Sequence, residues 1–116
     1  MLVLAILLAA ASPAGTQKYA GQAAFEALAD QADRRCPAQR IRSITPGDLD
    51  FAQDEFQAQL TQRNRMRLNA FNTADARCAD QNGLACQVHA TLEAMQKTQL
   101  LTRFSAYLCA HPAPGH

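Results

Sequence analysis

The sequence predicts an all-α fold, a small three-helix bundle in which a long antiparallel helical hairpin packs with a shorter N-terminal helix. Three observations lead to this prediction. Apolar residues recur at helical spacing over most of the 116-residue chain. An Asn-Gly pair at residues 82 and 83 interrupts a long helical pattern where a hairpin would turn. Four cysteines, an even number, predict two disulfides that cross-link the helices.

Residues 2 to 11 form an uncharged apolar segment. As a helix it is too short to span a bilayer, but it has the length of the apolar part of an export signal. Small residues follow it, although the basic residues that usually precede such a segment are missing. We therefore predict a signal peptide over residues 1–11 and a single helical domain over residues 12–116, which ends in a short tail with Pro and Gly. The expected location is periplasmic or secreted, with no transmembrane span in the mature chain.

The first predicted helix runs from about Gln17 to Cys36. One side of it is apolar and contains Phe25, Leu28, Ala32 and Cys36. The opposite side is acidic and contains Glu26, Asp30 and Asp33. Pro37 ends the helix, and the connection that follows is too short and too rich in arginine to predict a strand.

The second predicted helix begins at residues 45–48, where the sequence is Thr-Pro-Gly-Asp. Thr45 suits the N-cap and Pro46 the first helical position. The pattern continues to about Asp80 along an apolar stripe that contains Leu49, Ala52, Phe56, Leu60, Phe71, Ala74 and Cys78. Carboxylates crowd the first turns, and the helix dipole explains them better than acid–base chemistry does.

Two arginines interrupt this stripe. Arg67 lies at its centre and Arg63 beside it, and the facing part of the next helix carries Gln99. Because an unpaired arginine is costly to bury, we expect both side chains to extend to solvent while Leu68 takes the inner position. An anionic group bound between the helices is the alternative.

Gly83 predicts the end of the second helix, since glycine suits the left-handed residue after a helix and Leu84 the apolar contact beyond it. The third predicted helix runs from about Ala85 to Cys109. After Met95 its large apolar residues move to a second side of the helix: Leu100, Leu101, Phe104, Tyr107 and Leu108. Burial under the first helix is the favoured explanation, with Phe104 and Tyr107 partly exposed. Any part left uncovered would be a binding surface.

Hairpin geometry predicts which cysteines pair. Cys78 and Cys86 lie at equal distances before and after Asn82, so the two arms of a hairpin place them side by side. Cys86 and Cys109 would be about 35 Å apart on one continuous helix, far beyond the roughly 7 Å that a disulfide allows between Cα atoms. Cys36 and Cys109 both lie at the open end of the hairpin. We therefore predict Cys78–Cys86 and Cys36–Cys109.

A metal site is the competing explanation for these cysteines. Cys78, Cys86 and His89 are potential zinc ligands, and Cys109 with His111 forms a second pair. An oxidising compartment converts thiols to disulfides, and no four-ligand zinc signature occurs in the chain. We therefore predict no metal site and no cofactor.

Charge and motifs narrow the function classes. The chain holds 11 Lys and Arg against 10 Asp and Glu, a formal net charge of +1, whereas nucleic-acid-binding proteins are usually far more basic. It has neither a Gly-x-Ser-x-Gly motif nor a phosphate-binding glycine loop. The leading hypothesis is a non-enzymatic protein-interaction module of the bacterial envelope or exterior, with a protein partner or a second copy. The alternatives are a carrier of an apolar or anionic small molecule near Arg63 and Arg67, and a metal-binding protein.

Overall fold

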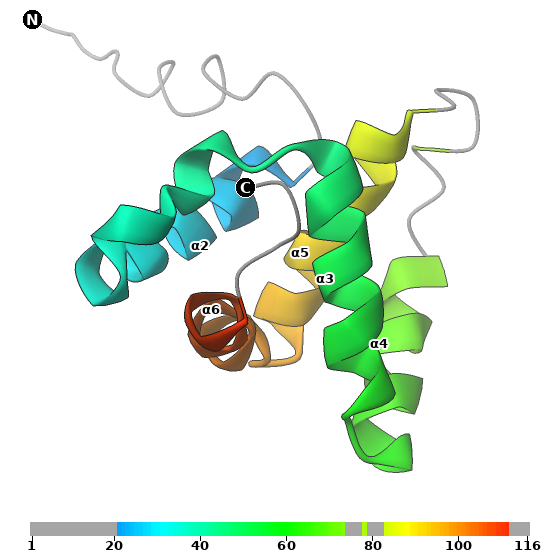
Figure 1. Ribbon diagram of the computed structural model, residues 1–116. Coiled ribbons are helices and arrows are strands. Elements are labelled where there is room, and N and C mark those ends of the chain that lie inside the picture. The colour runs from blue at the N-terminus through cyan, green and yellow to red at the C-terminus, as the bar shows by residue number, and fades with distance from the viewer. Residues whose placement is uncertain (1–20, 74–77, 79–82, 112–116) are drawn as a thin grey trace, which may run out of the picture.

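The structure is a computed structural model that describes residues 21–73, 78 and 83–111. The regular elements in these ranges are all helical, which confirms the all-α class (Figure 1). They are α2 (Gln22–Arg35), η1 (Pro37–Gln39), η2 (Ile41–Ser43), α3 (Pro46–Ala58), α4 (Gln62–Thr73), α5 (Leu84–Lys97) and α6 (Leu101–Ala110), where η1 and η2 are short 3-10 helices. The predicted signal peptide, residues 1–11, lies outside the described residues. None of the described helices has the length and apolar character needed to cross a membrane.

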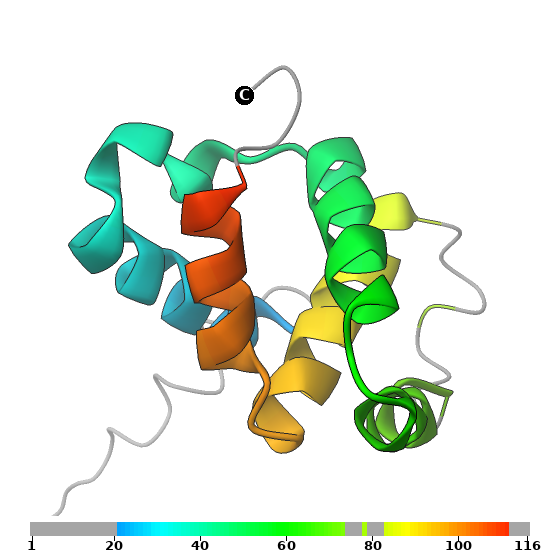
Figure 2. The same ribbon diagram turned by 60° about the horizontal axis from the view of Figure 1, so that its bottom comes forward.

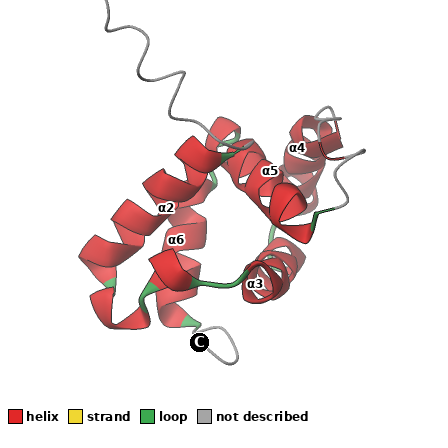
Figure 3. Ribbon diagram, turned by 90° about the horizontal axis from the view of Figure 1, so that it is seen from above, coloured by secondary structure: helices red, strands yellow, loops and turns green. Residues whose placement is uncertain are grey.

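The central helix of the bundle is α5. It packs against α2, α3, α4 and α6, and Figure 3 shows α2 and α6 on one side of it and α4 on the other. Val88, Leu92 and Met95 on α5 are at most 1% exposed. Burial of such side chains stabilises a fold by about 1.5–3 kcal/mol each. The core therefore surrounds α5.

The second predicted helix is divided into α3 and α4 by Gln59, Leu60 and Thr61. Thr61 caps the new helix, because its Oγ1 accepts a hydrogen bond from the backbone N–H of Asn64 at 3.2 Å. The change of direction lets Leu60 and Leu68 reach the core, where they are 4% and 0% exposed. The expectation of one continuous helix is wrong, and α4 lies at the edge of the molecule (Figure 2).

The third predicted helix is divided into α5 and α6 by a Schellman motif. The N–H of Leu100 donates to the carbonyl of Met95 at 2.7 Å, and the N–H of Gln99 donates to Gln96 at 3.2 Å. Gln99 has the positive φ of 61° that this motif requires, and Leu100, 2% exposed, makes the apolar contact beyond it. Glycine usually occupies the position of Gln99, so the sequence contains no ordinary signal for this break.

Two details at the predicted hairpin turn differ from expectation. Gly83 is the N-cap of α5, with an extended backbone at φ −94° and ψ 127° instead of the left-handed conformation. Leu84 is 42% exposed and Phe71 is 46% exposed, so neither joins the core. For Phe71 the cause is the direction of α4, which turns Leu68 toward the core and leaves Phe71 on the outer side. Asn82 lies outside the described residues.

The connection between α2 and α3 is held by an ion-pair cluster. Arg42 of η2 contacts Glu26 at 2.6 Å, Asp30 at 2.7 Å and Asp33 at 3.3 Å. These carboxylates are the acidic side of the first predicted helix, so one guanidinium bridges three carboxylates along α2. The hydrogen bonds that Arg42 donates to Glu26 and Asp30 are the main reason that the pKa of Arg42 is raised above its ordinary value.

Both predicted disulfides are present. Cys36 pairs with Cys109 and Cys78 with Cys86, each with a Cα–Cα distance of 5.7 Å. The first joins the end of α2 to α6, and the second joins residue 78 to the first turn of α5. The cysteine pairing is thus confirmed even though the hairpin arms are interrupted.

Candidate functional site

The apolar set predicted on the third helix belongs to the core. Leu100, Leu101, Phe104 and Leu108 are between 0% and 4% exposed, whereas Tyr107 is half-buried. Because α6 packs against both α2 and α3, both of its sides are covered, as the favoured explanation required. The expected partial exposure of Phe104 is wrong, since the ring of Phe56 covers it at a centroid distance of 5.1 Å. These side chains form no open binding surface.

Tyr107 lies at the border of this core. Its ring stacks on His111 at 4.2 Å and meets Phe56 edge-on at 5.6 Å. Burial, with the charge of Glu55 as a second cause, raises the pKa of the Tyr107 phenol above its ordinary value. The phenol is therefore neutral at physiological pH.

The arginines predicted as binding residues are exposed on α4. Arg63, Met66, Arg67 and Phe71 share its outer side, which we call the α4 face. Met66 is 63% exposed. Arg67 reaches Gln99 at 3.5 Å, a distance at the limit of a hydrogen bond. Arg63 and Arg67 thus extend to solvent as expected, and Leu68 takes the inner position. The predicted binding residues therefore fall into two separate groups, the exposed arginines of α4 and the buried apolar side chains around α6.

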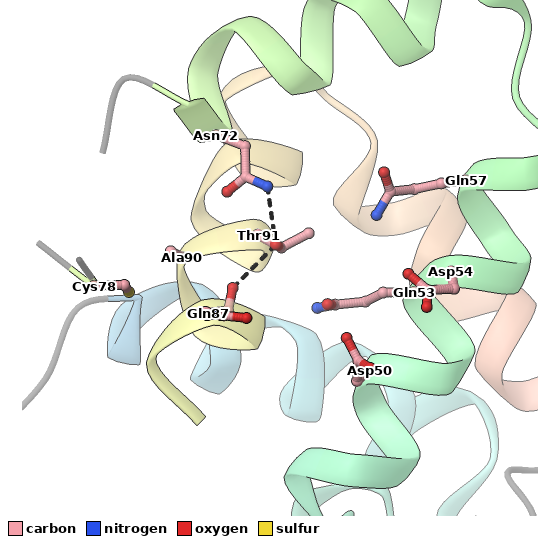
Figure 4. Close-up of a pocket in the computed structure, with 9 residues that line it drawn as sticks. All are labelled: Asp50, Gln53, Asp54, Gln57, Asn72, Cys78, Gln87, Ala90 and Thr91. Carbon is pink, nitrogen blue, oxygen red and sulfur yellow. Dashed lines mark hydrogen bonds between the residues drawn. The ribbon is translucent and has the colours of Figure 1, made fainter. Parts of the chain in front are cut away.

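A polar cleft lies between α3, α4 and α5 (Figure 4). Its volume is about 390 Å³, within the usual range for small-ligand sites. Amides and carboxylates dominate its lining, which consists of Asp50, Gln53, Asp54, Gln57, Asn72, Cys78, Gln87, Ala90 and Thr91. In Figure 4, Asp50 and Gln53 extend from α3 toward α5, and Asn72 reaches α5 from α4.

Hydrogen bonds fix the walls of this cleft. Gln53 is 2% exposed, and its Nε2 donates to the backbone carbonyl of Val88 at 2.9 Å. Asn72 Nδ2 donates to Thr91 Oγ1 at 3.2 Å, and that hydroxyl donates to the carbonyl of Gln87 at 3.0 Å. A buried amide without such partners would be costly. Polar side chains therefore link α3 and α4 to the central helix.

The cleft and the α4 face have opposite electrostatic character. Asp50 and Asp54 are the charged residues in the lining of the cleft, whereas α4 carries three arginines and no carboxylate.

Comparison with family models, curated proteins and solved structures finds no match to the chain.

The ligands considered for a metal site are engaged elsewhere. The sulfur atoms of Cys78, Cys86 and Cys109 are in disulfides, and a disulfide sulfur offers no thiolate. His89 packs against Phe25, with ring centroids 5.3 Å apart. In the part of the chain that the structure describes, no three His, Cys, Asp or Glu side chains group closely enough to hold a metal ion.

The cleft is not predicted from the sequence. The signal available for it was Gln53, which lies between Leu49 and Phe56 on the inner side of α3 and interrupts an otherwise apolar stripe. A polar residue at such a position needs a hydrogen-bond partner from a neighbouring helix. The partner of Gln53 is the backbone carbonyl of Val88 on α5, and only the packing of the helices reveals this pairing.

Proposed function

We propose that the protein is an exported, non-enzymatic protein-interaction module that presents the α4 face to an acidic partner surface. Export is supported by the two disulfides, which form and persist in oxidising compartments, and by the apolar segment at residues 2–11. The bacterial envelope or exterior is the compartment that fits these features.

The observation that carries this proposal is the composition of the α4 face. Met66 and Phe71 are 63% and 46% exposed and lie beside Arg63 and Arg67. Arginine, methionine and aromatic residues are enriched at protein interfaces, and methionine adapts its shape to a partner. Of the α4 side chains whose burial the structure describes, only that of Leu68 is fully buried. The outer side of α4 therefore contributes little to the core.

The test is binding to envelope proteins by the wild type and the double variant Arg63→Glu/Arg67→Glu. A matched control, Arg34→Glu/Arg35→Glu, reverses two exposed arginines of α2. A captured partner is purified and titrated against all three proteins at low and high salt. We expect the α4 variant to lose at least about tenfold in affinity, and the wild-type complex to weaken with salt. Equal affinity of all three proteins would contradict the proposal.

The polar cleft favours a second candidate function, the binding of a small polar ligand. Its carboxylates, Asp50 and Asp54, suit a cationic or neutral polar molecule better than the apolar or anionic one considered from the sequence. Spermidine and glutamate are suitable opposite probes. We expect spermidine to raise the melting temperature of the wild type but not of Asp50→Asn/Asp54→Asn, and glutamate to have no effect. A lack of any spermidine effect on the wild type would exclude this candidate.

A further inference from the structure

The outer side of α3 is acidic around an exposed aromatic ring. Phe51 is 50% exposed, and the exposed Asp54 and Glu55 lie one turn further along the helix, where Asp54 also borders the polar cleft. We call these three residues the α3 face. The helix carries four acidic residues and no basic one.

The α4 face is its counterpart in charge. Arg63 and Arg67 lie beside the exposed Met66, and the helix has no acidic residue. Each face thus presents an exposed apolar side chain with charges of a single sign next to it. Opposite charges around apolar centres are the arrangement that a specific protein interface uses.

The two faces do not neutralise each other within one chain. In the described ranges neither Asp54 nor Glu55 forms an ion pair with an α4 arginine, and the ion pairs that the structure shows there involve Arg42. Phe51 and Met66 also remain largely exposed. The complementary surface is therefore available to a second molecule.

We infer that the partner of the α4 face is the α3 face of a second copy of this chain. This inference rests on the proposed function and names its partner. Arg63 and Arg67 of one copy pair with Asp54 and Glu55 of the other, while Met66 packs on the ring of Phe51, a contact that sulfur and aromatic groups favour. A two-fold axis forms both contacts at once and closes a dimer.

Sedimentation velocity of the disulfide-bonded protein over a range of concentrations tests this inference. We expect the wild type to associate at low salt and to dissociate at about 0.5 M NaCl, where screening is strong. Two charge-reversed variants are compared with it: Arg63→Glu/Arg67→Glu, and Asp54→Arg/Glu55→Arg. Each alone is expected to weaken self-association by more than about tenfold, because attraction becomes repulsion.

Mixing these two variants gives the decisive measurement. The acidic α4 face of one variant then meets the basic α3 face of the other, so the mixture is expected to form a heterodimer although each component alone is a monomer. Arg34→Glu/Arg35→Glu is the control and should associate like the wild type. Thermal melts of all proteins establish that they fold.

Several outcomes would overturn the inference. They are a monomeric wild type at every concentration, self-association that the reversals leave unchanged, and a mixture that stays monomeric. A monomeric wild type that binds phosphatidylglycerol vesicles through Arg63 and Arg67 would assign the α4 face to a lipid surface instead. If the wild type is a monomer and binds a different protein, the variant Arg63→Glu/Arg67→Glu separates two outcomes. Loss of that binding in the variant would overturn self-association alone. An affinity of the variant equal to that of the wild type would overturn the proposed function as well.

Discussion

Gly21 lies at the start of α2 and touches the central helix. Its φ is +77°, and a Cβ atom built on it would collide with the backbone oxygen of His89. Both facts require glycine, because a side chain would strain the backbone and collide with main-chain atoms that cannot move aside. The close approach of α2 to α5 therefore depends on this residue.

We predict that Gly21→Ala lowers the free energy of unfolding by about 2–4 kcal/mol, from backbone strain and overpacking together. Gly47 is the matched control, since a Cβ there meets nothing within 4 Å. Gly47→Ala lies in the first turn of α3 and should leave stability unchanged or raise it by up to about 1 kcal/mol. Chemical denaturation measures both. Equal effects of the two substitutions would contradict the packing of α2 on α5.

His89 makes stability depend on pH. Burial lowers the pKa of its imidazole below the ordinary value, with a hydrogen bond to the Ala85 backbone acting in the opposite direction. The unfolded chain therefore binds a proton at a higher pH than the folded chain does. Stability from this group is complete above the unfolded pKa of about 6.5 and is lost as the pH falls below it.

We predict that the melting temperature of the wild type falls between about pH 7.5 and pH 5.5 by more than that of His89→Gln. Glutamine cannot take up a proton in this range, so the difference between the two curves reports His89 alone. Thermal melts at matched ionic strength measure it. Parallel curves would show that burial of the imidazole has no consequence for stability.

At the scale of elements, the breaks within the predicted long helices determine the shape of the bundle. Thr45 is recognisable as a cap because Pro46 suits the first helical position and Asp48 follows three residues after the cap, whereas Thr61 lies inside a stretch whose helical pattern continues on both sides. At the second break, Gln99 adopts a backbone conformation that its residue type rarely takes. Local sequence therefore predicted the class, the disulfides and many of the core residues, but neither the exposure of Phe71 and Leu84 nor where the chain changes direction.

The cleft was also beyond the reach of local patterns. Eight of its nine lining residues come from three helices, and Asn72 reaches Thr91 from α4, whose start at Gln62 was not predicted. The exposure of Arg63 and Arg67 was predicted correctly. The free-energy cost of burying an unpaired charge is large, so it indicates that these side chains reach solvent even when the packing of the helices is unknown.

We predict that Gln99→Gly is more stable than Gln99→Ala by about 1 kcal/mol, because only alanine retains the strain of a left-handed backbone. Both substitutions remove the weak contact with Arg67, so their difference isolates the backbone. Urea denaturation gives the comparison. A Gln99→Ala variant as stable as Gln99→Gly would mean that α5 and α6 are not separated by this motif.

At the scale of the whole molecule, the two disulfides differ in what they constrain. Cys36 and Cys109 are 73 positions apart, and Cys78 and Cys86 are 8 apart. Loop-closure entropy makes the longer link worth about 4.4 kcal/mol and the shorter one about 2.6 kcal/mol in the unfolded chain. The longer link also fixes α2 beside α6.

We predict that Cys36→Ser/Cys109→Ser loses about 2 kcal/mol more stability than Cys78→Ser/Cys86→Ser, on the entropy difference alone. Each double variant removes one disulfide and keeps the second one, so the two variants serve as controls for each other. Denaturation of the oxidised proteins measures both losses. A larger loss from the shorter link would show that residues 78–86 anchor more of the fold than their loop length implies.

The two links are also nested, since residues 78 and 86 lie inside the segment that Cys36 and Cys109 close. A protease that cuts the backbone once anywhere between residues 36 and 109 therefore releases no fragment while the disulfides remain. A cut between residues 78 and 86 is bridged by both links. While both disulfides stay oxidised, a first cleavage in this segment therefore leaves α2, α5 and α6 covalently joined.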